Sequence, residues 1–238
     1  MKKKLHIFLF VFCASFLLLK NSSTAQVFTE NALSMGIDHV YEARDLTGGG
    51  AAFFDYDNDG DEDLYLIKGQ KRDFLYENNG DGTFSRINTD IGLFASVQFN
   101  STGVTTGDID NDGDRDIFVT TWEMFNGPTT PNGRNLFFLN NGDGTFTEMG
   151  MQAGFTETSF SEGAIFLDYN KDGFLDIFVM NHIENVAFTY DSIGAISGYD
   201  HDCLPNFLYR NNGDLTFTEV SRTQCHWHEW MHHRWSIH

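Results

Sequence analysis

The sequence predicts an all-β protein, a β-propeller of four-stranded blades with about three blades present and an incomplete ring. Two repeated motifs predict it. The acidic pattern DxDxDGxxD occurs three times, as DYDNDGDED (55–63), DIDNDGDRD (108–116) and DYNKDGFLD (168–176), with an Asn at the third place of the last copy. A second motif, Asn-Asn-Gly-Asp, follows each acidic copy and begins at Asn78, Asn140 and Asn211. Self-similarity of this kind indicates a repeat architecture.

Each unit is expected to contain four strands. Small residues and an apolar run precede each acidic turn, and a second apolar run follows it. Aromatic and β-branched runs on both sides of Asn-Asn-Gly-Asp-Gly are typical of a hairpin. The expected order is strand, acidic turn, strand, loop, strand, hairpin turn, strand. The blades are expected at about 48–92, 101–155 and 161–222, within a repeat region that covers 26–222.

The first 25 residues have the features of a secretory signal peptide. Lys2 to Lys4 form a basic leader, an apolar run extends from Leu5 to Leu19, and the small residues Ser23 and Ala25 mark a cleavage site. A retained membrane anchor is disfavoured because the apolar run is shorter than the roughly 20 residues of a spanning helix. Bulky residues before Cys13 disfavour a lipoprotein. The protein is therefore expected to be secreted, or to lie at the cell surface or in the periplasm.

The charge and composition exclude several classes of function. The formal net charge is -19, which argues against nucleic acid or an anionic membrane surface as a partner. Aromatic residues make up 15% of the chain, so the acidity belongs to a packed protein and not to a disordered tail. Cys203 and Cys225 lie beyond the signal peptide and allow at most one disulfide.

The acidic turns are expected to bind about three calcium ions. Calcium takes six to eight oxygen ligands, and the glycine at the sixth place permits the bend that brings alternate side chains together. The third turn has one carboxylate fewer and should bind more weakly. The expected ligands are Asp55, Asp57, Asp59, Asp63 and the Asp61 carbonyl; Asp108, Asp110, Asp112, Asp116 and the Asp114 carbonyl; and Asp168, Asn170, Asp172, Asp176 and the Phe174 carbonyl.

Two alternatives to these calcium sites are disfavoured. An EF-hand loop needs an acid at its twelfth place followed by a helix, whereas Leu66, Val119 and Val179 stand there within β-rich runs. Solvated turns without an ion would leave four carboxylates repelling one another. The hairpin-turn residues Asn78, Asn79 and Asp81 could hold further ions, but they are interpreted as turn formers, because Asn and Gly supply left-handed conformations there.

The repeat resembles a known family. The acidic and Asn-Asn-Gly-Asp motifs, over roughly Phe28 to Val220, resemble the FG-GAP or VCBS repeats of integrin α-chain propellers and of bacterial secreted proteins related to cartilage acidic protein. This resemblance implies a propeller of about seven blades. It also implies a calcium-binding module for binding or adhesion, with an extracellular protein or glycan as partner.

The partner surface is expected in the insertions. The spacing from the first Asp of an acidic turn to the following Asn-Asn grows from 23 to 32 to 43 residues across the three units. Variable loops on a rigid scaffold are common binding sites. The expected contact residues are Trp122, Phe125, Tyr190 and Tyr199. The alternative is that these aromatic side chains pack onto their own blade.

An enzyme is the less favoured function. His182, Glu184, Asp200 and His201 lie in the longest insertion and could act as acid and base, in a calcium-dependent enzyme on an extracellular polysaccharide. However, the sequence contains no nucleophile elbow, zinc motif or phosphate loop.

Both ends of the chain depart from the repeat. The stretch from Val27 resembles the last strand of a blade without the strands before it, as expected where a ring closes with both chain ends. The final stretch, 223–238, is rich in His and Trp, and it has Cys225 where the earlier units have a glycine eight residues after Phe. It is interpreted as a shifted reading frame, a real capping tail or a metal-binding His cluster. Open blade edges could also allow self-association.

Overall fold

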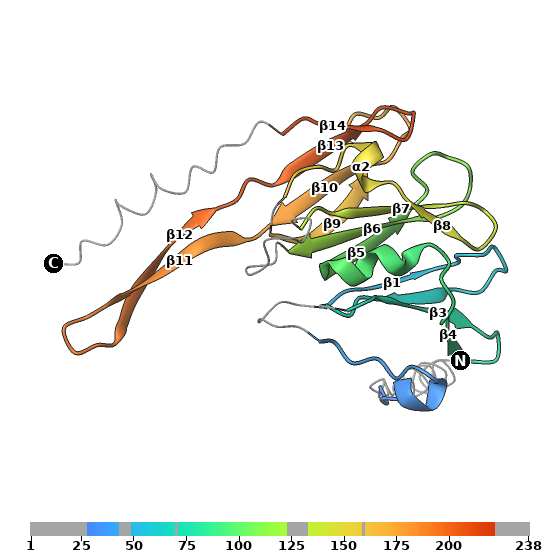
Figure 1. Cartoon of the computed structure of the whole chain (residues 1–238), viewed down its shortest axis with the longest axis horizontal. Coiled ribbons are helices and arrows are strands. Elements are labelled where there is room, and N and C mark those ends of the chain that lie inside the picture. The colour runs from blue at the N-terminus through green and yellow to red at the C-terminus, as the bar shows by residue number, and fades with distance from the viewer. Residues whose placement is uncertain (1–27, 43–48, 70, 123–132, 159, 222–238) are drawn as a thin grey trace, which may run out of the picture. The chain divides into compact units, whose positions relative to one another are not determined.

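Three four-stranded antiparallel sheets carry the three repeats in a computed structural model of the chain (Figure 1). The structure describes residues 28–42, 49–69, 71–122, 133–158 and 160–221. The strands of blade 1 are β1 (Ala51–Phe54), β2 (Asp63–Leu66), β3 (Phe74–Asn78) and β4 (Phe84–Arg86). Those of blade 2 are β5 (Asn100–Gly107), β6 (Asp116–Trp122), β7 (Leu136–Asn140) and β8 (Phe146–Glu148). Those of blade 3 are β9 (Ser161–Leu167), β10 (Asp176–Asn181), β13 (Phe207–Asn211) and β14 (Phe217–Glu219). The predicted all-β fold of four-stranded blades is confirmed.

The strand order within each blade follows from the two turns. The acidic turn joins the first and second strands, so that Phe54 lies opposite Asp63 in the register. The Asn-Asn-Gly-Asp turn joins the third and fourth strands, with Asn78 opposite Phe84. The same pairs recur in blade 2, where Gly107 lies opposite Asp116 and Asn140 opposite Phe146. Both turns therefore lie at the same end of each sheet.

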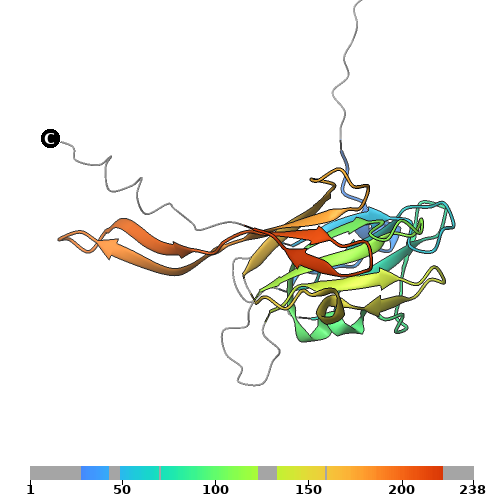
Figure 2. The ribbon, with the colours of Figure 1, turned by 90° about the horizontal axis from the view of Figure 1, so that it is seen from above.

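The blades stack face to face, and two apolar clusters fill the spaces between them (Figures 1 and 2). Between blades 1 and 2, Tyr65 and Leu75 pack against Ile117 and Phe138. Between blades 2 and 3, Phe118, Phe137 and Phe155 pack against Ile177 and Tyr209. Neighbouring residues of a central strand, such as Ile117 and Phe118 of β6, thus enter different cores. Both faces of the strand are buried, which explains why the central strands are apolar almost throughout.

A short helical segment lies next to a left-handed glycine in the stretch that leads into each blade. The segments are η1 (Ala32–Met35), η2 (Leu93–Gln98) and α2 (Gly150–Ala153). Gly36, Gly92 and Gly154 have φ values of 89°, 97° and 98°, which favour glycine. Each of these glycines lies against the carbonyl of the Phe that begins the last strand of the following blade, namely Phe84, Phe146 and Phe217.

The amino-terminal strand that the sequence predicts does not form in the described residues. Residues 28–31 contain no helix or strand, and they belong to a separate unit that ends at Asn31. What repeats from the other blades is the later part of the segment, η1 with Gly36. The motif was recognised correctly, but its strand was wrongly expected, because no neighbouring strand is present for it to pair with among the described residues.

The longest insertion forms a β-hairpin and not a loop. Strands β11 (Ile183–Tyr190) and β12 (Ile196–Cys203) pair with each other between β10 and β13, and they extend away from blade 3 (Figures 1 and 2). At the tip, the Asp191 Oδ1 accepts hydrogen bonds from the amides of Ile193 (3.0 Å) and Ala195 (2.9 Å). The insertion is thus an ordered hairpin with a closed turn.

Several predictions fall on residues that the structure does not describe. The signal peptide (1–25), Phe125 and the tail (223–238) are among them. Over the residues that are described, no helix is long and apolar enough to cross a membrane.

Candidate calcium centre

The backbone of each acidic turn adopts two left-handed residues. The fourth place is Asn58, Asn111 or Lys171, with φ of 64°, 63° and 63°. The sixth place is glycine in every turn, with φ of 96°, 101° and 90°. A Cβ at these glycines would meet no atom within 4 Å, so glycine serves the backbone angle and not a close contact.

The first Asp of each turn organises the amide groups behind it. In the first turn, Asp55 Oδ1 accepts a hydrogen bond from the Asp59 amide (3.2 Å), and Oδ2 accepts one from the Gly60 amide (2.9 Å). Asp108 and Asp168 accept the corresponding pairs at 3.1 Å. These bonds bend the turn so that the alternate side chains face inward.

The ninth residue ties the acidic turn to the hairpin turn. Asp63 is 1% exposed, and its two oxygens accept hydrogen bonds from the amides of Tyr56 (3.1 Å) and Asn78 (2.8 Å). Asp116 and Asp176 repeat this arrangement. Since each carboxylate oxygen has two lone pairs, these residues can still bind a cation. The sequence did not reveal this second role.

Burial makes Asp63 and Asp116 harder to ionise than a solvated carboxyl group. Desolvation by burial, with smaller contributions from neighbouring acids, raises the pKa of Asp63 to about 6 and that of Asp116 to about 7. Burial and the adjacent Asp59 or Asp112 also raise the pKa of Asp57 and of Asp110. None of the ion pairs among the described residues involves a carboxylate of the acidic turns.

Two of the three turns bring carboxylates together as a calcium site requires. One oxygen from each of Asp55, Asp57 and Asp63 lies within 4.8 Å of the others, and the same holds for Asp108, Asp110 and Asp112. Hard oxygen donors converging on one point suit calcium. The donor set of these two turns therefore fits the ion that the sequence predicts.

The third turn is arranged differently. The Asn170 side-chain amide donates a hydrogen bond of 2.7 Å to Asp172 Oδ2, so these two predicted ligands bind each other. The described residues of this turn form no group of converging acids. The predicted ligands outside the two converging groups are Asp59, Asp61, Asp114 and Asp116 of the first two turns, and Asp168, Asn170, Asp172, Phe174 and Asp176 of the third.

The family comparison covers all three turns. A model of the FG-GAP-like repeat matches residues 55–119 and 124–179, about half of the chain. The chain belongs to the FG-GAP-like repeat family. The first match contains the acidic turns of blades 1 and 2, and the second contains that of blade 3. FG-GAP repeats are typical of β-propeller-like binding modules in extracellular or surface proteins, and they often bind calcium.

Other parts of the predicted resemblance go beyond this match. The family match concerns the repeat itself and does not bear on a relationship to integrin chains or cartilage acidic protein. The comparison with curated proteins found no match.

The hairpin turns confirm one part of the interpretation and correct another. Gly80 and Gly82 are left-handed, with φ of 70° and 87°. Asn78 and Asn79 are not among the residues with positive φ, so the left-handed role expected of Asn is wrong. The side-chain nitrogen Nδ2 of Asn78 instead donates to the Glu62 carbonyl (3.1 Å), and Nδ2 of Asn79 donates to Thr83 Oγ1 (2.9 Å).

The predicted partner residues lie in different surroundings. The Trp122 ring packs against Phe160 and His182, with ring centroids 5.5 Å apart in both pairs. Tyr190 is 62% exposed on the hairpin. Tyr199 is the register partner of Phe188, and its side chain lies outside the described set.

The predicted acid and base residues are only partly described. His182 Nε2 lies 3.8 Å from Glu162 Oε1, at the base of the hairpin. Glu184, Asp200 and His201 belong to the hairpin strands, and their side chains are outside the described set.

Proposed function

We propose that the protein is a secreted or surface-exposed FG-GAP binding module in which calcium holds the acidic-turn end of the blades. The convergence of Asp55, Asp57 and Asp63, and of Asp108, Asp110 and Asp112, supports this proposal most directly. The ions would offset the repulsion among these acids and fix each turn to its hairpin through the buried ninth residue. Affinities of about 10⁻⁴ to 10⁻³ M would suit an extracellular site.

Calcium titration by calorimetry on the purified chain tests this proposal. Two stronger sites in the turns of blades 1 and 2 are expected, with a weaker third in blade 3. Magnesium should compete poorly because it requires a smaller octahedral site. If calcium produces no heat of binding and leaves the melting temperature unchanged, the proposal fails.

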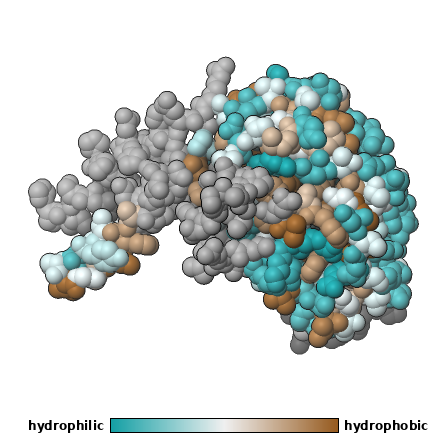
Figure 3. All heavy atoms as spheres, in the orientation of Figure 1, coloured by the Kyte–Doolittle hydropathy of each residue, from teal (hydrophilic) through white to brown (hydrophobic). Residues whose placement is uncertain are grey.

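We further propose that the β11–β12 hairpin contributes to recognition of an extracellular protein or glycan. Phe188, Tyr190, Ile193 and Ile196 are 53%, 62%, 87% and 62% exposed, an unusual accumulation of large apolar side chains. In Figure 3 hydrophobic spheres gather at the end of the hairpin. Aromatic side chains at such a place can stack on sugar rings or fill a protein pocket.

A hairpin deletion separates recognition from folding. The Leu204 amide donates to the His182 carbonyl (3.4 Å) at the hairpin base, so a Gly-Gly link can replace 183–203. Screening a glycan panel and extracellular proteins with both forms should show ligands bound by the full chain alone. If the shortened chain also loses calcium binding, the proposal that the hairpin serves recognition while the acidic turns bind calcium is contradicted.

Binding, and not catalysis, is the activity we propose. His182 lies beside Glu162 and contacts the Trp122 ring, an arrangement that a structural His at the base of a hairpin also explains. The less favoured proposal is a calcium-dependent enzyme acting on an extracellular polysaccharide. Polysaccharide turnover that is lost in His182→Ala would establish it.

A further inference from the structure

The second residue of the first acidic turn makes hydrogen bonds in two directions. This residue is Tyr56, which stands between the expected ligands Asp55 and Asp57. Its amide donates to Asp63 Oδ2 of the same turn (3.1 Å), and its carbonyl accepts from Asn140 Nδ2 of blade 2 (2.9 Å). Tyr56 therefore joins the first proposed calcium site to the neighbouring blade.

Asn140 extends this connection to the second proposed site. Its main-chain amide donates to Asp116 Oδ1 (2.9 Å), and Asp116 Oδ2 accepts from the Ile109 amide (2.9 Å). Ile109 is the second residue of the second turn, where Tyr56 stands in the first. A continuous series of hydrogen bonds thus links the buried acid of the first turn, Asp63, to that of the second.

The same series continues into blade 3. The Ile109 carbonyl accepts from Asn211 Nδ2 (2.9 Å), and the Asn211 amide donates to Asp176 Oδ1 (2.9 Å). Asp176 is the ninth residue of the third turn and is 0% exposed. Since the two contacts use the same places in the repeat, the series is a property of the contact between consecutive blades.

A second link connects the acidic turns directly. Asn58 Nδ2 of the first turn donates to Asp114 Oδ1 of the second (2.6 Å), and Asn111 Nδ2 of the second donates to the Gly173 carbonyl of the third (3.2 Å). Asn58 stands between two expected ligands of the first site, and the Asp114 carbonyl is an expected ligand of the second. An ion that fixes either turn therefore also restrains a residue of the other site.

An empty acidic turn contains a repulsion that a bound ion removes. Carboxylates lie close together in each of the first two turns, and an ion that binds among them fixes the turn against its conformational entropy. Once the first turn is fixed, the Tyr56 carbonyl and the Asn58 side chain are held in place for their partners in blade 2. Less ordering is then required when the second turn binds its ion, so the second ion binds more tightly.

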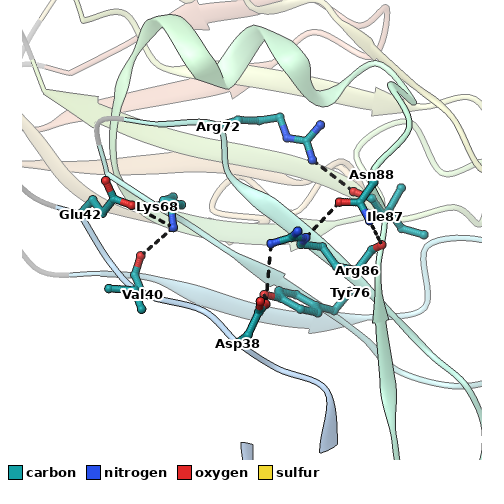
Figure 4. Close-up of polar contacts among 9 residues, drawn as sticks. All are labelled: Asp38, Val40, Glu42, Lys68, Arg72, Tyr76, Arg86, Ile87 and Asn88. Carbon is teal, nitrogen blue, oxygen red and sulfur yellow. Dashed lines mark hydrogen bonds and ion pairs between the residues drawn. The ribbon is translucent and has the colours of Figure 1, made fainter. Parts of the chain in front are cut away.

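Polar contacts elsewhere in blade 1 involve no residue of an acidic turn (Figure 4). Arg72 donates to the Ile87 carbonyl (3.2 Å), and Lys68 donates to the Val40 carbonyl (3.1 Å). Removing an ion is therefore expected to loosen its turn without unfolding the blade. A change of affinity at the other turn can then be attributed to the links between the turns.

We infer that Asn58 and Asn140 are positioning residues that couple the first two calcium sites, so that an ion in either site raises the affinity of the other. The inference rests on the calcium sites proposed above and gives them a regulation that independent sites lack. Because the coupling belongs to the pair of sites, each ion raises the affinity for the other by the same factor. A factor of about five or more is expected.

Calcium calorimetry on three chains measures this factor. Asp57→Asn leaves the second site, Asp110→Asn leaves the first, and the wild type has both, while the weaker third site is present in every chain. The association constant for filling both sites of the wild type should exceed the product of the two single-site constants by about fivefold or more. If calcium binds but the two values agree, the inference fails and the proposed calcium sites stand. If the wild type binds no calcium, both fail.

Asn140→Ala, introduced into the same three chains, should reduce the coupling factor toward one. Alanine keeps the main-chain amide that donates to Asp116 but lacks the side-chain bond to Tyr56. Asn141→Ala is the matched control, because Asn141 is the next residue and its Nδ2 donates within its own turn, to Thr145 Oγ1 (2.9 Å). This control should keep the factor of the wild type, and an equal reduction in both variants would contradict the role of Asn140.

Asn58→Gly gives an independent test if Asn140→Ala fails to fold. Asn58 is exposed and has a φ of 64°, which glycine adopts readily. Loss of its bond to Asp114 should reduce the coupling factor as well, because this bond joins the two turns directly. A factor that stays unchanged in either variant would overturn the inference.

Discussion

The side-chain amide of Asn140 donates a hydrogen bond of 2.9 Å to the main-chain carbonyl of Tyr56 in the neighbouring blade. The same amide also reaches the Arg115 carbonyl of its own blade, at 3.3 Å. Asn140 is 2% exposed, so this one side chain satisfies two carbonyls where little water can replace it. The interface between blades thus depends on a residue that the sequence indicated only as a turn former.

Removing this amide should weaken the contact between blades 1 and 2. Asn140→Ala is expected to lower the free energy of unfolding by about 1–3 kcal/mol, because a buried acceptor is left without a donor. Asn78→Ala is the matched control, since Asn78 occupies the same place but its side-chain amide donates within its own blade, to the Glu62 carbonyl. Denaturant unfolding in calcium measures both. Equal losses would show that the bond between blades contributes nothing.

Losing a carboxylate from an acidic turn should weaken calcium binding there. Asp57→Asn is expected to remove the calcium-dependent heat of the first site and to reduce the rise in melting temperature. A ligand at 100 times its Kd stabilises a protein by about 2.7 kcal/mol, which sets the scale of the effect. Glu62→Gln removes the same charge from an exposed residue of the same turn that is not a proposed ligand. Calcium titration should therefore show loss of the first site in Asp57→Asn and no such loss in Glu62→Gln.

Asp73 should make stability depend on pH. This carboxylate is 3% exposed and accepts hydrogen bonds from the Lys68 amide (2.8 Å), Ser101 Oγ (2.8 Å) and Tyr65 Oη (3.1 Å). Desolvation by burial raises its pKa to about 7, above the ordinary value of 3.8. The folded state therefore holds the proton more tightly, and the free energy of unfolding should fall as pH rises from about 4 to about 7.

Asp73→Asn should remove this dependence. Asn135 and Asn206 stand at the equivalent places in blades 2 and 3, where their oxygens accept from the amides of Thr121 (3.0 Å) and Asn181 (2.8 Å). The variant is expected to be more stable than the wild type at pH 8, by about 2–4 kcal/mol, and similar to it at pH 4. Denaturant unfolding at both pH values, in calcium, measures the difference. If Asp73→Asn gains as much stability at pH 4 as at pH 8, ionisation of the Asp73 carboxyl group is not the source of the gain.

The glycines between blades should tolerate no side chain. Gly92 has a φ of 97°, and a Cβ there would overlap the Phe146 carbonyl. Gly92→Ala is expected to cost about 3 kcal/mol or more. Gly82 has a similar φ of 87° with no atom within 4 Å of an added Cβ, so Gly82→Ala should cost only the backbone strain of about 1–2 kcal/mol. Thermal unfolding of the two variants measures both losses of stability, and the difference between them reports the cost of the steric overlap at Gly92.

The repeated motifs made the blades predictable, because each turn type joins a fixed pair of strands. The alternate acids likewise placed Asp57 and Asp110 in converging groups. The hairpin of the longest insertion was missed because the register shifts after Glu184 and after Thr189 interrupt the alternation of apolar and polar residues. The hydrogen bonds that the buried Asp63 accepts from main-chain amides were missed as well. A sequence shows which acids recur, but not which amides donate hydrogen bonds to them.

The bond from Asn140 also bears on how such a chain can lengthen. Its acceptor is a main-chain carbonyl, which belongs to Tyr56 in one blade and to Ile109 in the next. A main-chain carbonyl is present whatever side chain the residue carries, so the residue at this position can be substituted without loss of the hydrogen bond. For this hydrogen bond, a newly duplicated repeat would therefore need no matching substitution in the older repeat, whereas the apolar clusters between blades still require complementary side chains on both.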